Sequence, residues 1–335
     1  MSLKEFFFKT PFLYSFFSVR FLMKMAKKNK IAIFYHFIKD DKEDLTKYLY
    51  KAKNKTQFIE DLFFLKKHFT SISVVDYVNN TKKEELNFFL SFDDGLANFY
   101  DVVAPILIKE KVHAINFLNS NFIDNKCLFY RYKINILVSF IIEEKLSKAQ
   151  KNTFCKELEF FDFEKEKVVN QLKKLTILDV QKIDELLNIC HFSTDDYLNQ
   201  QQPYLTKEHI IKLEKKGFQF GSHSENHPRY IHLSLENQIK ETIKSIQKVN
   251  EIAKTNYFAF PFSDDGVSKE FFQKMASENI ITFGSSGLKD EDFENHYQRI
   301  PMEYNSIYSA ETIVKGELFY YLLKKLLGKN KRKMD

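Results

Sequence analysis

The sequence lacks, or has little of, the residue types that mark several special classes of protein. Its 335 residues include 8 glycines, 6 prolines and no tryptophan. So few glycines and prolines exclude a collagen-like chain, a low-complexity chain and a long flexible linker. Hydrophobic residues make up 44% of the chain and charged residues 29%, which excludes a disordered protein and a polytopic membrane protein. The chain is long enough to bury a sizeable core in one large domain or two ordinary ones.

Cysteine and arginine are also scarce. The three cysteines, Cys127, Cys155 and Cys190, are far apart and form no CxxC pair. This usage is typical of reduced, buried thiols, so we expect a cytoplasmic protein. Only five of the 51 basic residues are arginines, and the net charge of +6 is spread over a chain in which both signs are mixed. A nucleic-acid partner would require a concentrated, arginine-rich basic face, so we expect none.

Both ends of the chain are apolar, but neither contains a long uninterrupted hydrophobic run. Within residues 1–29, Lys9, Arg20 and Lys24 interrupt the apolar residues. The longest uncharged run, residues 10–19, is shorter than the roughly 20 residues that a membrane-spanning helix needs. No small-residue cleavage site follows it, so we expect no cleaved signal peptide.

The C-terminal segment, residues 310–335, has apolar residues at helical spacing and a basic tail. The apolar positions are Val314, Leu318, Leu322 and Leu326, and the tail contains Lys329, Lys331, Arg332 and Lys333. Two interpretations of the chain ends stay open. In one, the ends pack against each other through Phe12, Phe16 and Leu22 on one side and Leu318, Leu322 and Leu326 on the other. In the other, their lysines contact anionic lipids, and the protein lies peripherally on the inner face of the cytoplasmic membrane.

Between the ends, short apolar strands alternate with helices. The patterns predict strands over 31–36, 87–92, 113–118, 218–222, 257–262 and 280–283. They predict helices over 56–69 with Thr56 as N-cap, over 101–109, after Ser234, and over 268–278. Buried strands separated by helices indicate parallel βαβ units, in an open sheet or a barrel. No GxGxxG motif follows the first strand and no GxxxxGK(S/T) motif is present, which argues against a nucleotide-binding open sheet.

Residues 125–202 interrupt this alternation, because they are polar, helical in period and without strand runs. They predict a helical insertion into a body formed by residues 30–124 and 203–309. The chain therefore divides into an N-terminal helix (1–29), this body, the insertion, and a C-terminal amphipathic helix with its tail (310–335).

Two motifs at strand ends carry the chemistry. Residues 91–95, Ser-Phe-Asp-Asp-Gly, end an apolar strand with two carboxylates and a glycine. At the carboxyl end of a parallel strand such acids converge on the functional site, although two acids and a glycine also make an ordinary surface turn. His223 and His227 follow another strand, and imidazoles four residues apart can bind one metal from a single helical turn.

Together these residues suggest a hydrolytic metal site. One carboxylate and two histidines provide three ligands and leave an open position for water, and the second carboxylate can accept a proton. Since adjacent strand residues point to opposite faces, we expect the chain to turn at Gly95. Residues 263–266, Ser-Asp-Asp-Gly, resemble the motif at residues 91–95. We expect a surface turn there, in preference to acids at the rim of the same site.

The motifs resemble those of the polysaccharide deacetylases of carbohydrate esterase family 4. The family's Ser/Thr-Phe-Asp-Asp-Gly motif matches residues 91–95, its His-Ser/Thr-x-x-His motif matches residues 223–227, and its Pro-aromatic pair matches Pro261 and Phe262. Residues 129–133 and 298–301 resemble members found in bacterial surface-polysaccharide gene clusters.

The resemblance implies an α/β fold, a distorted (β/α) TIM-like barrel. It implies a divalent metal, most simply zinc but with cobalt, nickel or manganese as alternatives, held by Asp94, His223 and His227. It assigns Asp93 as general base and the backbone N–H of Phe262 as a donor to the oxyanion. Phe260 and Pro261 are then expected at the substrate.

Two departures from the family pattern bear on activity. Ala259 stands where many relatives have arginine, and Arg299 is the candidate replacement beside Asp93. The family's late catalytic histidine has no clear equivalent, since His296 and His232 are weak candidates, so the general acid stays open.

We expect a metal-dependent deacetylase acting on N-acetylated sugars of a bacterial surface glycan or its lipid-linked precursor. The alternatives are a glycan-binding or scaffold protein that has lost turnover, and a metallophosphatase with the same ligands.

Overall fold

Parallel strands form the centre of the molecule, in the order β10-β9-β8-β7-β6-β5-β1-β11. The computed structural model describes residues 3–39, 46–304 and 308–331. The strands are β1 (Lys30–Tyr35), β5 (Asn87–Phe92), β6 (Ala114–Leu118), β7 (Gln219–Ser222), β8 (Tyr257–Ala259), β9 (Ile281–Gly284), β10 (His296–Gln298) and β11 (Ile300–Pro301). Each neighbouring pair in this order is parallel. The short β4 (Thr70–Ser71) also pairs with β5, and β2 (Ile38–Lys39) pairs with β3 (Lys53–Asn54) in a separate sheet.

One segment of chain closes the sheet into a barrel. Only Arg299 separates β10 from β11, yet β10 pairs with β9 and β11 pairs with β1 at the opposite end of the strand order. Residues 296–301 therefore join the two ends of the sheet. The predicted α/β fold, a distorted (β/α) barrel, is confirmed.

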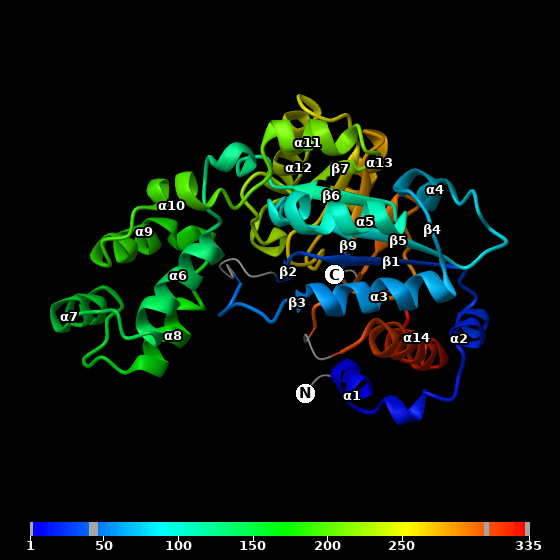
Figure 1. Cartoon of the computed structure of the whole chain (residues 1–335), viewed down its shortest axis with the longest axis horizontal. Helices are drawn as coiled ribbons and strands as arrows, with labels where there is room; N and C mark the ends of the chain where they lie inside the picture. Colours follow the sequence, from blue (N-terminus) through cyan, green and yellow to red (C-terminus); the bar gives the residue numbers. More distant parts are fainter. Residues whose placement is uncertain (1–2, 40–45, 305–307, 332–335) are drawn as a thin grey trace.

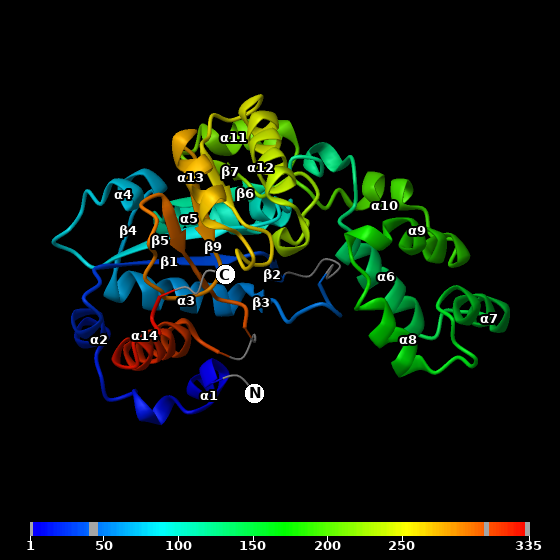
Figure 2. The same ribbon diagram turned by 180° about the vertical axis from the view of Figure 1, so that it is seen from behind.

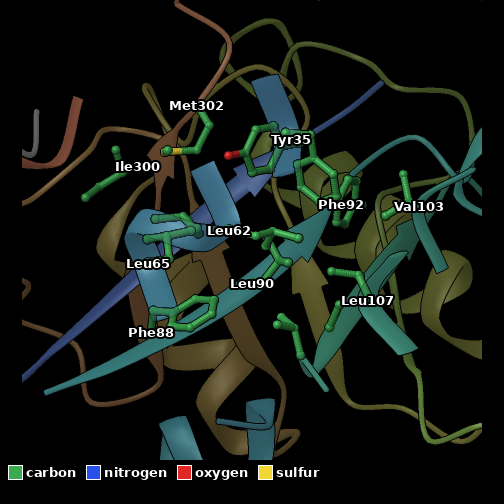
Figure 3. Close-up of a cluster of buried hydrophobic side chains, with 14 of the residues drawn as sticks. Tyr35, Leu62, Leu65, Phe88, Leu90, Phe92, Val103, Leu107, Ile300 and Met302 are labelled. Carbon is green, nitrogen blue, oxygen red and sulfur yellow. The ribbon is translucent and has the colours of Figure 1, made fainter. Parts of the chain in front are cut away.

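Helices cover the outside of the barrel because each strand has one apolar face turned toward them. These helices are α3 (Lys55–His68), α4 (Val74–Asn79), α5 (Ala104–Glu110), α11 (Lys207–Glu214), α12 (Leu235–Asn250) and α13 (Lys269–Ser277). Figure 3 shows Leu62 and Leu65 of α3 over Phe88, Leu90 and Phe92 of β5, all with under 2% of their surface exposed. The alternate residue, Phe89, points inward and packs on Phe283 with ring centroids 5.5 Å apart. Buried faces on both sides explain why four of the six residues of β5 are large and apolar.

The insertion is a helical lobe beside the barrel (Figures 1 and 2). It contains α6 (Tyr130–Ile142), α7 (Lys148–Glu157), α8 (Lys165–Leu172), α9 (Val180–Ile189) and α10 (Thr194–Gln201). Helices this short are not stable alone, and they share one buried cluster that includes Leu137 and Phe154. Phe122 and Tyr204, at the edge of the barrel, belong to the same cluster, so the lobe is fastened to the barrel by apolar contacts.

The two ends of the chain pack together on one side of the barrel, where α1 (Leu3–Lys9), α2 (Val19–Ala26) and α14 (Ala310–Leu326) lie side by side (Figure 1). Phe7 and Phe319 are in edge contact at 5.5 Å, and Leu22 and Leu318 are buried. Phe12, Phe16 and Leu326 are instead 65%, 92% and 83% exposed. The packing interpretation therefore accounts for the inner residues of these segments and not for the outer ones.

Within the described residues, no helix has the length and apolar character required to cross a bilayer. Arg332 and Lys333 of the predicted basic tail lie outside these residues.

Two local predictions need correction. α3 is capped by Asn54 and not by Thr56, because the Asn54 side chain accepts from the Gln57 backbone N–H and the Gln57 side chain accepts from that of Asn54. The strand predicted over 257–262 ends at Ala259, since Pro261 has no N–H to continue the ladder.

Candidate active site

Asp93 and Asp94 follow β5, at the end of the barrel that faces the insertion. Asp94 has a φ of 73° and Gly95 a φ of 64°, so the chain turns one residue earlier than expected from the glycine. Both side chains are buried, at 2% and 5% exposure, and both line the same cavity. The early turn is what brings two adjacent acids to one site.

His223 and His227 follow β7 in a loop and not in a helical turn, which corrects the sequence prediction. Ser224 and His227 have left-handed φ values of 71° and 59°, and the Ser224 hydroxyl accepts from the His227 backbone N–H at 2.9 Å. This tight loop folds the second imidazole back over the first, with ring centroids 4.8 Å apart.

Asp94, His223 and His227 form a buried cluster of possible metal ligands. Asp94 Oδ1 lies 3.6 Å from His223 Nε2 and 3.3 Å from His227 Nε2. His223 Nδ1 donates to the Ala259 carbonyl at 2.8 Å, which leaves the lone pair of Nε2 facing Asp94. Burial lowers the pKa of His223 to about 4, so its imidazole is neutral near pH 7.

The unsatisfied atoms of this cluster fit a cation. Asp94 Oδ1 and His223 Nε2 are buried and have no hydrogen-bond partner among the described residues. Polar atoms buried in this way are destabilising unless they are paired or coordinate a metal. A carboxylate oxygen and two imidazole nitrogens are a common donor set for a catalytic divalent metal.

Asp93 is held by Arg299 through two parallel hydrogen bonds. Nη1 donates to Oδ1 at 2.7 Å and Nη2 donates to Oδ2 at 2.9 Å. Burial alone would raise the pKa of Asp93, but the charge of Arg299 and its hydrogen bonds to the carboxylate outweigh burial and lower it. Asp93 is therefore an ionised carboxylate at neutral pH. Arg299 therefore lies beside Asp93, the position for which the sequence made it a candidate.

The cavity over these groups has a volume of 270 Å³. The barrel provides its floor, and the start of α6 provides Phe129, Arg131 and Tyr132 on one side. The Tyr132 hydroxyl donates to Asp94 Oδ2 at 3.3 Å. The insertion is thus part of the site, because it contacts the acid that belongs to the candidate metal cluster.

Comparison with known proteins agrees with this geometry. The family model described as polysaccharide deacetylase matches residues 80–280, which is more than half of the chain and includes both motifs. The chain belongs to the polysaccharide deacetylase family. This deacetylase is therefore a hydrolase. No curated protein matches its sequence.

Several solved structures share the fold of this deacetylase. The Streptococcus pyogenes deacetylase PplD, in complex with acetate, has 15% identity and a TM-score of 0.53, with 86% of this chain and 97% of that chain covered. IcaB from Ammonifex degensii has 13% identity and a TM-score of 0.51, covering 87% and 97%. A de-N-acetylase from Aggregatibacter actinomycetemcomitans has 14% identity and a TM-score of 0.53, covering 86% and 99%. At these identities the likeness concerns the fold.

His36, which the sequence patterns did not predict at the site, follows β1 and lines the cavity of the deacetylase. Its Nδ1 lies 2.7 Å from Glu303 Oε2, and Glu303 also accepts from the backbone N–H groups of His36 and Phe37. Burial would lower the pKa of His36, but the hydrogen bond and charge of Glu303 raise it to about 9. His36 is thus a protonated imidazole at neutral pH. The only signal in the sequence was a polar residue at the end of an apolar strand.

Of the two residues expected at the substrate, Phe260 lines the cavity and Pro261 does not. The Phe262 ring lines the cavity and packs edge-on against His227 at 4.5 Å. Phe260 also lines the cavity, although most of its ring is buried against Tyr230 and Phe271. Pro261 is buried and is not among the described residues that line the cavity, because the chain turns there to redirect the strand.

The other acid and histidine candidates are not at the cavity. Asp264 is fully buried and contacts His296 Nε2 at 3.0 Å and Gln298 Nε2 at 2.7 Å, so the surface turn expected over 263–266 is wrong at this residue. His232 is exposed in a short 3₁₀ turn. Neither His296 nor His232 is among the described residues that line the cavity.

Proposed function

We propose that this deacetylase is metal-dependent and removes acetyl groups from N-acetylated sugars of a bacterial surface polysaccharide or its lipid-linked precursor. The observation that carries the proposal is the placement of Asp94, His223 and His227 beside the Asp93–Arg299 pair in one cavity. The cluster offers the ligands of a hydrolytic metal, and the pair offers a charged proton acceptor. The N-linked acetyl group is favoured because one structure of the same fold is a de-N-acetylase.

The ligand set suits zinc, and it also accepts cobalt, nickel or manganese. When bound, such a cation would act as a Lewis acid toward the acetyl carbonyl. Tyr132 and the Ala259 carbonyl would orient two of its ligands, Asp94 and His223, through the hydrogen bonds described above.

Asp93 is the proton acceptor in this proposal. It takes a proton from water as the water oxygen adds to the acetyl carbonyl carbon, which gives a tetrahedral oxyanion. Arg299 fixes both oxygens of Asp93, so the carboxylate is oriented before substrate binds. The backbone N–H of Phe262 is the expected donor to the oxyanion.

His36 is the proton donor in this proposal and fills the role that the sequence left open. When the carbon–nitrogen bond breaks, the sugar nitrogen must receive a proton to leave as an amine, and acetate is the second product. His36 lines the cavity and carries a proton at neutral pH because Glu303 stabilises its charged form. We assign it as the general acid on this geometry.

The test measures acetate released from N-acetylated oligosaccharides by the full-length protein. We expect release by the zinc-loaded protein, loss after chelation and recovery when zinc is returned. A metal-loaded protein that is inert on every N-acetylhexosamine glycan tested would overturn the proposal in favour of a glycan-binding or scaffold protein. Phosphate released from sugar phosphates in place of acetate would favour a metallophosphatase.

A further inference from the structure

The segment from η1 to α2 presents large apolar side chains to solvent. η1 (Pro11–Leu13) and the turn after it carry Phe12, Phe16 and Phe17, at 65%, 92% and 39% exposure. α2 adds Phe21 at 46% and Met25 at 53%. Single exposed apolar residues are common on protein surfaces, but with Leu13 at 38% exposure there are six within the fourteen residues 12–25, which form a patch that calls for a partner.

Two of these side chains contact each other, and buried residues of α2 anchor the segment that carries them. Phe17 and Phe21 stack with ring centroids 5.3 Å apart, and Met25 follows Phe21 by one helical turn. On the opposite face of α2, Val19, Leu22 and Met23 are buried. The Lys315 ammonium donates to the Ser15 carbonyl at 3.3 Å and ties the exposed turn to α14.

The C-terminal end of α14 extends the patch. The Lys325 ammonium donates to the Ala26 carbonyl at 3.2 Å, which places the last turn of α14 beside the last turn of α2. Leu326 and Leu327, at the end of α14, are 83% and 67% exposed. We call the seven residues Phe12, Phe16, Phe17, Phe21, Met25, Leu326 and Leu327 the apolar rim.

The chain segment that carries the aromatic residues of the apolar rim contains only basic charges, although Asp290 pairs with Lys28, and Glu84 and Glu85 line the same pocket as Arg20. Residues 6–38 contain six basic residues and no aspartate or glutamate. Arg20, Lys24 and Lys27 are exposed between the apolar side chains, and they form no salt bridge with any described residue. A patch of exposed phenylalanines interspersed with cations complements the acyl boundary and the anionic headgroups of a bilayer.

The apolar rim lies where an extended flat surface, such as a bilayer, could contact it. In Figures 1 and 2 the turn between α1 and α2 lies at the outer edge of the molecule, on the side away from the insertion. Phe16 belongs to this turn and has 92% of its surface exposed. We propose that the apolar rim and its flanking cations are a membrane-docking surface for anionic lipid bilayers, with the aromatic side chains inserted at the headgroup level.

The experiment measures sedimentation of the full-length protein with vesicles of phosphatidylcholine and of phosphatidylcholine mixed with phosphatidylglycerol. We expect binding to the anionic vesicles at low salt, weaker binding at high salt, and little binding to the neutral ones. Phe12→Ser with Phe16→Ser should weaken binding about tenfold or more. Arg20→Gln and Lys24→Gln should each weaken it about fivefold.

A matched control comes from the insertion. Phe161 is 99% exposed and belongs to the connection between α7 and α8, helices that lie far from α2 in Figure 1. Phe161→Ser therefore removes a highly exposed phenylalanine outside the rim and should leave vesicle binding unchanged. Thermal unfolding of each variant checks that these surface changes keep the fold. Equal binding by the Phe12→Ser, Phe16→Ser variant and the wild type would overturn the proposal. The proposal would also be overturned if the wild-type protein stayed in the supernatant with anionic vesicles at low salt. It would be overturned as well if the wild-type protein were a stable dimer and the double variant a monomer, because the rim would then be a dimer interface.

Discussion

Arg299 is charged and fully buried, and its surroundings explain why arginine and not lysine occupies this position. Its guanidinium lies 4.4 Å from the centre of the Phe34 ring and 5.1 Å from that of Phe117. One edge of this plane binds both oxygens of Asp93, and Nε donates to the Gly284 carbonyl. A lysine would provide one point charge in place of a planar fork.

Arg299→Lys should therefore uncouple catalysis from metal binding. We expect kcat/KM to fall about a hundredfold, because Asp93 keeps a positive neighbour but loses its fixed orientation. The metal content should not change, since Asp94, His223 and His227 are untouched. Acetate release and metal analysis of the same preparation check this, and a fully active Arg299→Lys variant would show that the two-point contact is unimportant.

His36 gives a prediction about pH and stability. Its pKa is about 9 in the folded protein and about 6.5 in an unfolded chain. The stabilisation from its contact with Glu303 is therefore complete below about pH 6.5 and is lost as the pH rises through about 9. We expect His36→Gln to lower the free energy of unfolding more at about pH 6 than at about pH 10, measured by urea denaturation. An equal loss at both pH values would contradict the raised pKa.

At the scale of elements, the sequence predicts the long, regular strands and helices. It does not predict features that depend on residues far away in the chain. β5 begins and ends where its apolar run predicts, because both of its faces are buried. β10 and β11 have only three and two residues and are interrupted by a charged arginine, so no periodicity marks them. The proton-donor candidate was missed for a related reason, since the charge of His36 depends on Glu303, 267 residues away. The candidate metal ligands Asp94, His223 and His227 were predicted because their motifs are local in the sequence.

The first turn of α6 links the insertion to the site, and Tyr132 tests this link. Tyr132→Phe removes only the hydroxyl that donates to Asp94. We expect metal affinity to fall about tenfold, the lower range for loss of a hydrogen bond that orients a ligand. Tyr204→Phe is the matched control, because its hydroxyl accepts from the Phe129 backbone N–H and does not contact the metal cluster. Titration with metal gives the affinity of both variants. Equal affinities would mean that the insertion does not affect metal binding.

At the scale of the whole molecule, closure of the barrel assembles the two halves of the site. The candidate metal ligands come from the ends of β5 and β7, whereas Arg299 comes from the segment that joins β9 to β1. The insertion lies beside the end of the barrel that carries the site, and the terminal helices with the exposed apolar rim lie on another side. Catalysis and the proposed membrane contact therefore use separate surfaces, and variants of the rim should leave acetate release from soluble oligosaccharides unchanged.

The central claim is that the site is divided into metal ligands and a separate proton acceptor. The most direct test is the metal-to-protein ratio of Asp93→Asn and Asp94→Asn, each purified at full length and assayed for acetate release. We predict that Asp93→Asn retains its metal and loses activity, because it removes a proton acceptor, and that Asp94→Asn loses most of its metal, as His223→Ala and His227→Ala should. An Asp93→Asn protein without metal beside an Asp94→Asn protein that retains it would reverse the two roles and contradict the account.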